Sequence, residues 1–308
     1  MMDKFKKVRI VGRILALVLI IKQVSKNRRA FRLSFLEIIR EAVKFIYLGY
    51  SEKLKYIYKY YLLVKFINKE ETQFLLKEVF DFEIFRVFTP KRNPVIVDIG
   101  GNIGIATLYL SNHFPRSTIH VFEPNPTSYK VLRENVSLNH ISNIVTYEKA
   151  VTGKKHKRKK LFLPTENSTT SSFQLNFSNL FSQKLKTKYV ESISLEELIK
   201  TLGHINILNI DAEGEEIFLI PEIIKLSDKI DMIIIEMHEF RDKPIYSLIQ
   251  SLKSKYNTAT RNLYDMEAVN NRLFQLNKNE PMLCFMLYGV AKRLLKRRYA
   301  HSPLINSG

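Results

Sequence analysis

The chain has 308 residues, of which 45% are hydrophobic, a net charge of +19 and one cysteine, Cys284. This length and composition suit one large α/β domain with extensions, or two small domains, and exclude a disordered chain. A single cysteine excludes an internal disulfide framework and a cysteine-rich zinc site. We therefore expect a reducing compartment, the cytoplasm.

The positive charge is concentrated at the two ends of the chain. Residues 1–60 contain 15 Lys/Arg and 4 Asp/Glu, and residues 291–308 contain 5 Lys/Arg and no acidic residue. An enzyme that acts on nucleic acid usually carries its basic patch on the folded body, around its site. We therefore expect a basic helical N-terminal extension (1–60), a main domain (61–290) and a basic C-terminal tail (291–308), with nucleic acid disfavoured as a partner.

An apolar run from Ile10 to Ile21 lies between basic residues near the N-terminus. It is too short to span a bilayer, which needs about 20 residues, and no signal-peptide cleavage site follows it, so we expect no cleavage. Two alternatives remain open. The run is either a helix at the cytoplasmic membrane face, with peripheral contact to anionic lipid through residues 1–30, or a helix packed on its own domain.

In the rest of the chain the pattern of apolar residues changes once, from helical spacing to alternating strands and helices. Apolar residues at three- and four-residue spacing predict helices from Phe31 to Phe80, and VFDFEIFRVF predicts a short extended segment. Strand and helix patterns then alternate, which is typical of a doubly wound α/β fold. The predicted strands are 95–100, 117–124, 143–151, 205–211 and 230–238, with a closing antiparallel pair at 256–264 and 283–290; a basic and polar stretch, 154–179, interrupts them as a loop.

The loop after the first predicted strand has the sequence DIGGNIG, from Asp98 to Gly104. Its glycines allow a sharp turn and let a ligand approach the backbone, and the helix that follows presents free N–H groups. No Gly-Lys-Ser/Thr follows, which excludes a Walker loop, and Asn102 stands where a dinucleotide fingerprint requires glycine. Asp98 can anchor the loop or, through water, the ammonium of a methionine moiety.

A second acidic residue, Glu123, ends the next predicted strand, 19 residues after Gly104. A carboxylate at this position can accept two hydrogen bonds from a ribose diol. Either a nicotinamide or an adenosylmethionine cofactor would use it. Glu123 therefore supports a nucleoside site without selecting the cofactor.

Four segments in order, VIVDIGGNIGIATLYL, VFEPNPTSYKVLRENVSLN, VTYEKAV and LNIDAEGEE, resemble the motifs of the FkbM family of methyltransferases over roughly residues 94–240. The resemblance implies a class I methyltransferase (Rossmann-like) α/β fold, with a mainly parallel seven-stranded sheet and one antiparallel strand. It also implies transfer of a methyl group from S-adenosyl-L-methionine to a hydroxyl of a sugar, glycan or natural-product small molecule.

The resemblance further implies which residues bind the cofactor. Asp98, Gly100, Gly101, Asn102 and Gly104 would lie at the methionine end, Glu123 at the ribose and Ala150 at the adenine. The sequence departs from the family pattern at Gly101, where alanine is frequent, and at Ala212, where valine is frequent. Neither position touches the expected chemistry.

Methyl transfer to an aliphatic hydroxyl requires a group that removes or holds its proton. Candidates follow the fourth and fifth predicted strands, at the edge where ligands bind in such sheets. We favour a metal-free site of Asp211, Glu213 and His238, with Asp211 or His238 as the general base. In the alternative, a divalent ion held by Asp211, Glu236 and His238 lowers the acceptor pKa. A helix cap at Asp211 and a structural role for His238 also remain open.

Two other functions remain possible. Methylases of exocyclic base nitrogens typically carry an Asn/Asp-Pro-Pro-aromatic motif after the fourth strand, and here Ile210-Asp211-Ala212-Glu213 stands instead. This sequence disfavours an RNA methyltransferase, although Lys154 to Lys160 could bind phosphate if they are not simply a solvated loop. The second alternative is a non-catalytic binding module with the same fold.

Overall fold

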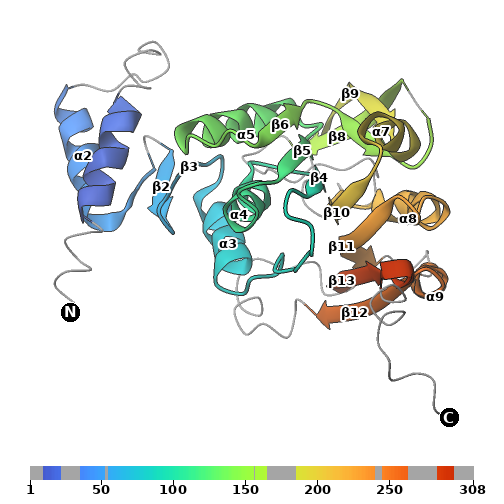
Figure 1. The fold of residues 1–308 in the computed structure, drawn as a ribbon. Helices are drawn as coiled ribbons and strands as arrows, with labels where there is room; N and C mark the ends of the chain where they lie inside the picture. The colour runs from blue at the N-terminus through green and yellow to red at the C-terminus, as the bar shows by residue number, and fades with distance from the viewer. Residues whose placement is uncertain are drawn as a thin grey trace, which may run out of the picture.

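The computed structural model describes residues 10–21, 35–52, 55–155, 157–164, 185–239, 245–262 and 283–294. Its centre is a seven-stranded sheet in the order β12-β13-β11-β10-β4-β5-β6 (Figure 1). β13 is antiparallel to both neighbours, and the other adjacent strands are parallel. The predicted fold class is thereby confirmed. The strands are β4 (Val95–Ile99), β5 (Thr118–Phe122), β6 (Ile144–Tyr147), β10 (Ile205–Ile210), β11 (Ile230–Glu239), β12 (Tyr256–Asn262) and β13 (Leu283–Ala291).

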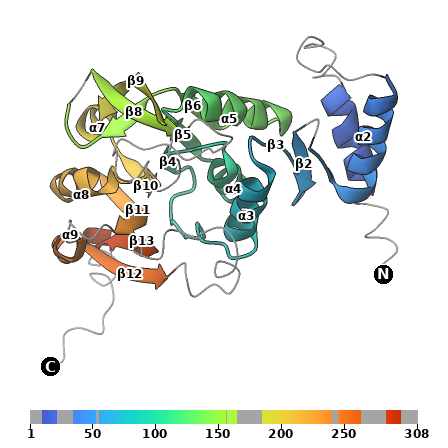
Figure 2. The same ribbon diagram turned by 180° about the vertical axis from the view of Figure 1, so that it is seen from behind.

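Helices cover both faces of this sheet (Figures 1 and 2). Alternate strand residues face opposite sides, so Ile96 and Ile207 belong to one core cluster and Val97 and Leu208 to the other. Burial on both faces explains the continuous apolar runs of the strands. The first cluster includes residues of α3 (Lys69–Phe80), α4 (Ile105–His113) and α5 (Pro126–Leu138), and the second includes residues of α7 (Leu195–Leu202), α8 (Glu216–Lys225) and α9 (Ile245–Lys253).

The chain reverses direction across the sheet between β4 and β10. From β4 it runs outward through β5 and β6, and it later returns to β10 on the other side of β4. At such a switch point the loops after the two strands diverge and leave room for a ligand. Here the start of the second loop is still tied to the first strand, because the Asp211 N–H donates to the Ile99 carbonyl at 2.9 Å.

The helical prediction for residues 49–65 is wrong. After α2 (Phe35–Leu48), the strands β1 (Tyr50–Ser51), β2 (Tyr56–Lys59) and β3 (Leu62–Lys65) form an antiparallel sheet. Aromatic and β-branched residues favour strands here, and Tyr60 and Tyr61 take the positive φ values, 53° and 61°, of a tight hairpin turn. The predicted boundary between the N-terminal extension (1–60) and the main domain (61–290) falls in this turn. The extended segment predicted after it begins instead as the end of α3, and residues 83–89 lie in no strand.

The predicted third strand and the loop after it are also different in the structure. The strand divides, because β6 ends at Tyr147 and Ala150 begins β7 (Ala150–Thr152) of a separate sheet with β8 (Arg158–Pro164) and β9 (Leu185–Ser194). Arg158 to Lys160 therefore lie in a strand, and Lys159 forms an ion pair with the buried Glu215 at the start of α8. The polar stretch from residue 165 lies outside the described residues.

Two glycines with positive φ allow a test of the contact between the loops after β4 and β10. A Cβ on Gly100 (φ 84°) would lie 1.7 Å from the Asp211 carbonyl oxygen, whereas one on Gly203 (φ 76°) would meet nothing within 4 Å. We expect Gly203→Ala to lower the free energy of unfolding by about 1–2 kcal/mol, from backbone strain alone. Gly100→Ala should cost several kcal/mol more in urea unfolding. Equal losses would contradict the contact.

Candidate active site

The glycine loop between β4 and α4 is held by backbone hydrogen bonds. The N–H groups of Gly100 and Gly101 both donate to the Phe122 carbonyl, at 2.9 and 3.1 Å. A Cβ on Gly101 would lie 2.2 Å from the Val121 side chain. Gly104 (φ 94°) is the N-cap residue of α4 and has no side chain to cap the helix. The first N–H groups of α4 therefore lack a capping side chain and can face an anionic or polar group of a ligand.

Asp98 lies beneath this loop and is fully buried. Its Oδ2 accepts a hydrogen bond from Thr107 Oγ1 at 2.5 Å, and its Oδ1 accepts one from Asn209 Nδ2 at 2.8 Å. Burial raises the pKa of Asp98, while these two hydrogen bonds lower it. Asp98 thus links β4, α4 and β10, which agrees with the anchoring alternative for this residue.

Glu123 lies beside the glycine loop, at the end of β5. Its Oε2 accepts a hydrogen bond from the Asn102 N–H and its Oε1 accepts one from the Asn125 N–H, both at 2.7 Å. The residue is 5% exposed, and burial raises its pKa to about 7 although both backbone hydrogen bonds oppose this shift. Each oxygen keeps a further lone pair, so the fixed carboxylate can still accept hydroxyl donors.

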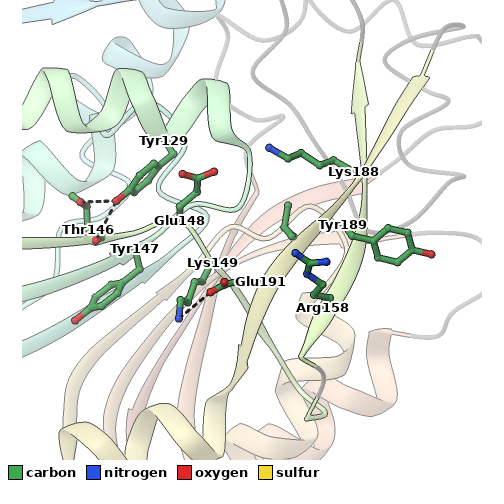
Figure 3. A pocket seen from close by; sticks show the side chains of 10 residues that line it. Tyr129, Thr146, Tyr147, Glu148, Lys149, Arg158, Lys188, Tyr189 and Glu191 are labelled. Atoms are coloured by element: carbon green, nitrogen blue, oxygen red, sulfur yellow. Dashed lines mark hydrogen bonds and ion pairs between the residues drawn. The ribbon is translucent and has the colours of Figure 1, made fainter.

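Ala150 lies apart from the glycine loop. Its side chain is buried with Leu161 and Val190 in a small cluster, so a contact with adenine would come from its backbone. An open pocket of about 470 Å³ lies nearby, between the end of β6 and the β8–β9 hairpin (Figure 3). Its lining includes Tyr129 and Arg158 but none of the predicted cofactor residues. The adenine role of Ala150 stays a prediction.

The predicted catalytic residues lie together at the carboxyl ends of β10 and β11. His238 is 4% exposed, and its Nε2 lies 3.5 Å from Glu213 Oε2 and 3.7 Å from Glu236 Oε1. Asp211 follows β10 directly, and its Oδ1 is buried without a hydrogen-bond partner among the described residues. The structure thus groups these side chains as the strand order predicted.

Glu216 is a member of this group that the sequence did not reveal. Its Oε1 lies 3.2 Å from His238 Nδ1, and its two oxygens accept the N–H groups of Ala212 and Gly214 at 3.0 and 2.7 Å. It therefore fixes both the imidazole and the turn after β10. The N-cap of α8 is Glu215, so the helix-cap alternative for Asp211 is wrong.

The crowding of carboxylates changes their protonation. Burial raises the pKa of Asp211 well above its usual range, and the charges of Glu236 and Glu213 add to this shift. Burial also raises the pKa of Glu213 to about 8, an effect that His238 opposes. Glu78 on α3, again not predicted, has its pKa raised by burial and by Glu236. These neighbouring carboxyl groups can therefore hold a proton at neutral pH and share it among them.

The same residues offer ligands for a cation. One ligand atom each from Asp211, Glu216 and His238 lie within 4.8 Å of one another. Carboxylate oxygens suit a hard divalent ion. The third ligand beside Asp211 and His238 is therefore Glu216, whereas the sequence analysis expected Glu236.

The chain resembles known proteins over this region. The family model described as the methyltransferase FkbM domain matches residues 98–280. The methyltransferase sdnD of Sordaria araneosa is 42% identical over 73 residues, which are 24% of this chain and 28% of that protein. Methyltransferase 1 of Beauveria bassiana is 26% identical over 163 residues, or 48% and 66% of the two chains. The 31-O-demethyl-FK506 methyltransferase FkbM of Streptomyces tacrolimicus is 28% identical over 142 residues, or 46% and 48%.

These alignments span less than two thirds of each relative's length. The family match, in contrast, covers more than half of the 308 residues and includes the glycine loop and Glu123. It also includes what we call the acidic cluster: Asp211, Glu213, Glu216, Glu236 and His238. The chain belongs to the FkbM methyltransferase domain family, as its motifs predicted.

Proposed function

We propose that this chain is an S-adenosylmethionine-dependent O-methyltransferase that acts on a hydroxyl of a sugar, glycan or natural-product small molecule. The contact of Gly100 with the Asp211 carbonyl carries the proposal, since it holds the glycine loop and the acidic cluster at one edge of the sheet. Family membership supports methyl transfer. The printed name of the Streptomyces relative, a 31-O-demethyl-FK506 methyltransferase, supports oxygen as the acceptor atom.

The residues at the loop fit the cofactor. When bound, S-adenosylmethionine supplies a methyl group on a sulfonium centre. Glu123 would hold the ribose diol, because its fixed oxygens retain lone pairs toward hydroxyl groups. The loop from Gly100 to Gly104 leaves the first N–H groups of α4 uncapped for the methionine end.

His238 is the proposed general base. Glu216 would hold Nδ1 in its protonated form and leave the Nε2 lone pair for the hydroxyl proton of the acceptor. Nε2 would take the hydroxyl proton as the acceptor oxygen receives the methyl group, and the cofactor would leave as S-adenosylhomocysteine. Glu213 Oε2 lies 3.5 Å from Nε2, and in its ionised form, which predominates above its pKa of about 8, Glu213 would accept this proton from His238 and pass it to solvent.

Two parts of this proposal have alternatives. A divalent ion held by Asp211, Glu216 and His238 could lower the acceptor pKa in place of a general base, and we favour the metal-free version. A non-catalytic binding module and an RNA methyltransferase remain the competing functions. We also propose a cytoplasmic location, which the single cysteine of the chain supports.

The first prediction concerns the ribose carboxylate. Because burial raises the pKa of Glu123 to about 7, the carboxylate is protonated below this pH and loses acceptor strength. Calorimetry should show S-adenosylmethionine affinity rising as the pH increases through about 7. Glu123→Gln should weaken binding by about tenfold or more and flatten this dependence. Glu196→Gln on α7, at a partly exposed carboxylate outside the site, is the control. No measurable affinity at any pH would instead favour the binding module.

A second prediction concerns the base. With a mixed acceptor extract and labelled cofactor, His238→Ala should lower the rate of methyl transfer by about 10²–10⁴ while cofactor affinity stays unchanged. Glu216→Gln should cause a smaller loss and shift the pH profile, since it acts through the imidazole. His140→Asn, at an exposed histidine beyond α5, should have no effect. Full turnover by Asp211→Asn with intact cofactor binding would remove Asp211 from the catalytic set.

A third prediction separates the two versions of proton removal. Dialysis against EDTA should leave methyl transfer unchanged if His238 acts without a metal. Loss of activity that magnesium or manganese restores would establish the cation version instead. Cofactor binding measured on the same dialysed sample distinguishes either result from unfolding.

A further inference from the structure

Two helices at one end of the molecule form a unit, which we call the N-terminal helix pair: residues 10–21 and α2, residues 35–48 (Figure 1). Arg13 on the first helix donates hydrogen bonds to the carbonyls of Ile46 and Tyr47, at 3.1 and 2.6 Å, at the end of α2. Gly12 allows the first helix to lie against β2, since a Cβ there would meet Tyr58 Oη at 2.3 Å. The two helices therefore have a defined packing.

One side of the helix pair packs on the rest of the chain. Ala16, Leu17 and Ile20 are buried in a core cluster with Phe45 of α2, and this cluster extends to β2, β3 and the end of α5. Packing on its own domain, one of the two alternatives for the apolar run, is thus present in the structure. This packing covers only part of the circumference of each helix.

Away from this core, both helices of the pair expose large apolar side chains. Leu15 is 63% exposed and Tyr47 is 75% exposed. Scattered apolar residues are normal on a surface, but a concentration of them on two packed helices marks an interaction site. The other exposed apolar residues also follow helical spacing. They are Ile10, Val11, Ile14, Val18 and Ile21 on the first helix, and Ile39, Val43 and Leu48 on α2.

Basic residues outnumber acidic ones on the helix pair and, by sequence, in the segments beside its first helix. Arg40 and Lys44 are exposed on α2, and the buried Glu41 accepts hydrogen bonds from Ser51 Oγ at 2.6 Å and from Lys44 Nζ at 3.2 Å. By sequence, basic residues also stand directly before and after the first helix. They are Lys4, Lys6, Lys7 and Arg9 before it, and Lys22, Lys26, Arg28, Arg29 and Arg32 after it.

We infer that the N-terminal helix pair docks on an anionic membrane. Its exposed apolar side chains would enter the boundary between headgroups and acyl chains, and its basic residues would contact lipid phosphates. The helices would lie in the plane of the membrane, since helices of 12 and 14 residues reach about 18–21 Å, against about 30 Å of hydrocarbon. None of the helices in the described part of the chain combines the length and apolar composition of a membrane span.

A lipid surface suits this face better than a second copy of the chain. Residues 1–60 carry 15 basic and 4 acidic residues, so self-association through this face would bring two strongly positive segments together. An anionic bilayer offers both an apolar interior and opposite charge. The inference concerns where the protein lies and is independent of the acceptor that it methylates.

Co-sedimentation of the full chain with vesicles tests this inference. We expect binding to vesicles of equimolar phosphatidylglycerol and phosphatidylcholine, and at least tenfold weaker binding to phosphatidylcholine alone. The double variant Leu15→Gln/Tyr47→Gln should weaken binding to the anionic vesicles by about tenfold or more. Phe88→Gln, at a 77% exposed apolar residue outside the helix pair, is the matched control and should bind as the parent does.

Three results would overturn the inference. They are the absence of binding to anionic vesicles, equal binding to both lipid compositions, and unchanged binding by the double variant. A lipid-free dimer in sedimentation velocity that the double variant abolishes would instead assign the face to a second copy. Because the substituted side chains are exposed, thermal unfolding should give the same midpoint for parent and variants, which excludes misfolding as the cause of lost binding.

Discussion

The backbone contact between the loops after β4 and β10 is the constraint on which the site depends. Gly100 takes a φ of 84° and has the Asp211 carbonyl where a Cβ would otherwise lie, while the Asp211 N–H donates to Ile99. No other residue type fits both conditions. The contact fixes the distance between the loop that would hold a nucleoside and the acidic cluster. Transfer chemistry needs this fixed geometry, because reacting groups must be aligned before the bond changes.

Around this contact, buried polar groups hold the loops of the site in one arrangement. Burying their charges costs free energy. Asp98 joins three elements through Thr107 and Asn209, and Glu216 joins the turn after β10 to His238. The raised pKa values of Glu123, about 7, and Glu213, about 8, mean that the folded chain binds more protons than the unfolded chain. Their contribution to stability is present below about pH 4.5 and is lost as the pH rises through 7 to 8. Such a cost is typical of a functional site.

The N-terminal helix pair shows how one amphipathic segment can satisfy two demands. Ile20 and Phe45 anchor the pair to the main domain through a shared core, while Leu15 and Tyr47 remain exposed. A helix that served the fold alone would not need apolar residues around most of its circumference. The pair lies at one end of the molecule in both views, away from β12 at the opposite edge of the sheet (Figures 1 and 2).

The sequence by itself determined the repeating β/α pattern from Val95 onward, because apolar runs and helical spacing are local signals. It also placed Asp211, Glu213, Glu236 and His238 at one sheet edge, since residues that follow parallel strands share that edge. Tertiary structure decided the features that depend on distant partners. The β7–β9 sheet pairs segments that are far apart in sequence, and Glu216 contacts an imidazole 22 residues away. Glu78 enters the site only because α3 packs against the sheet.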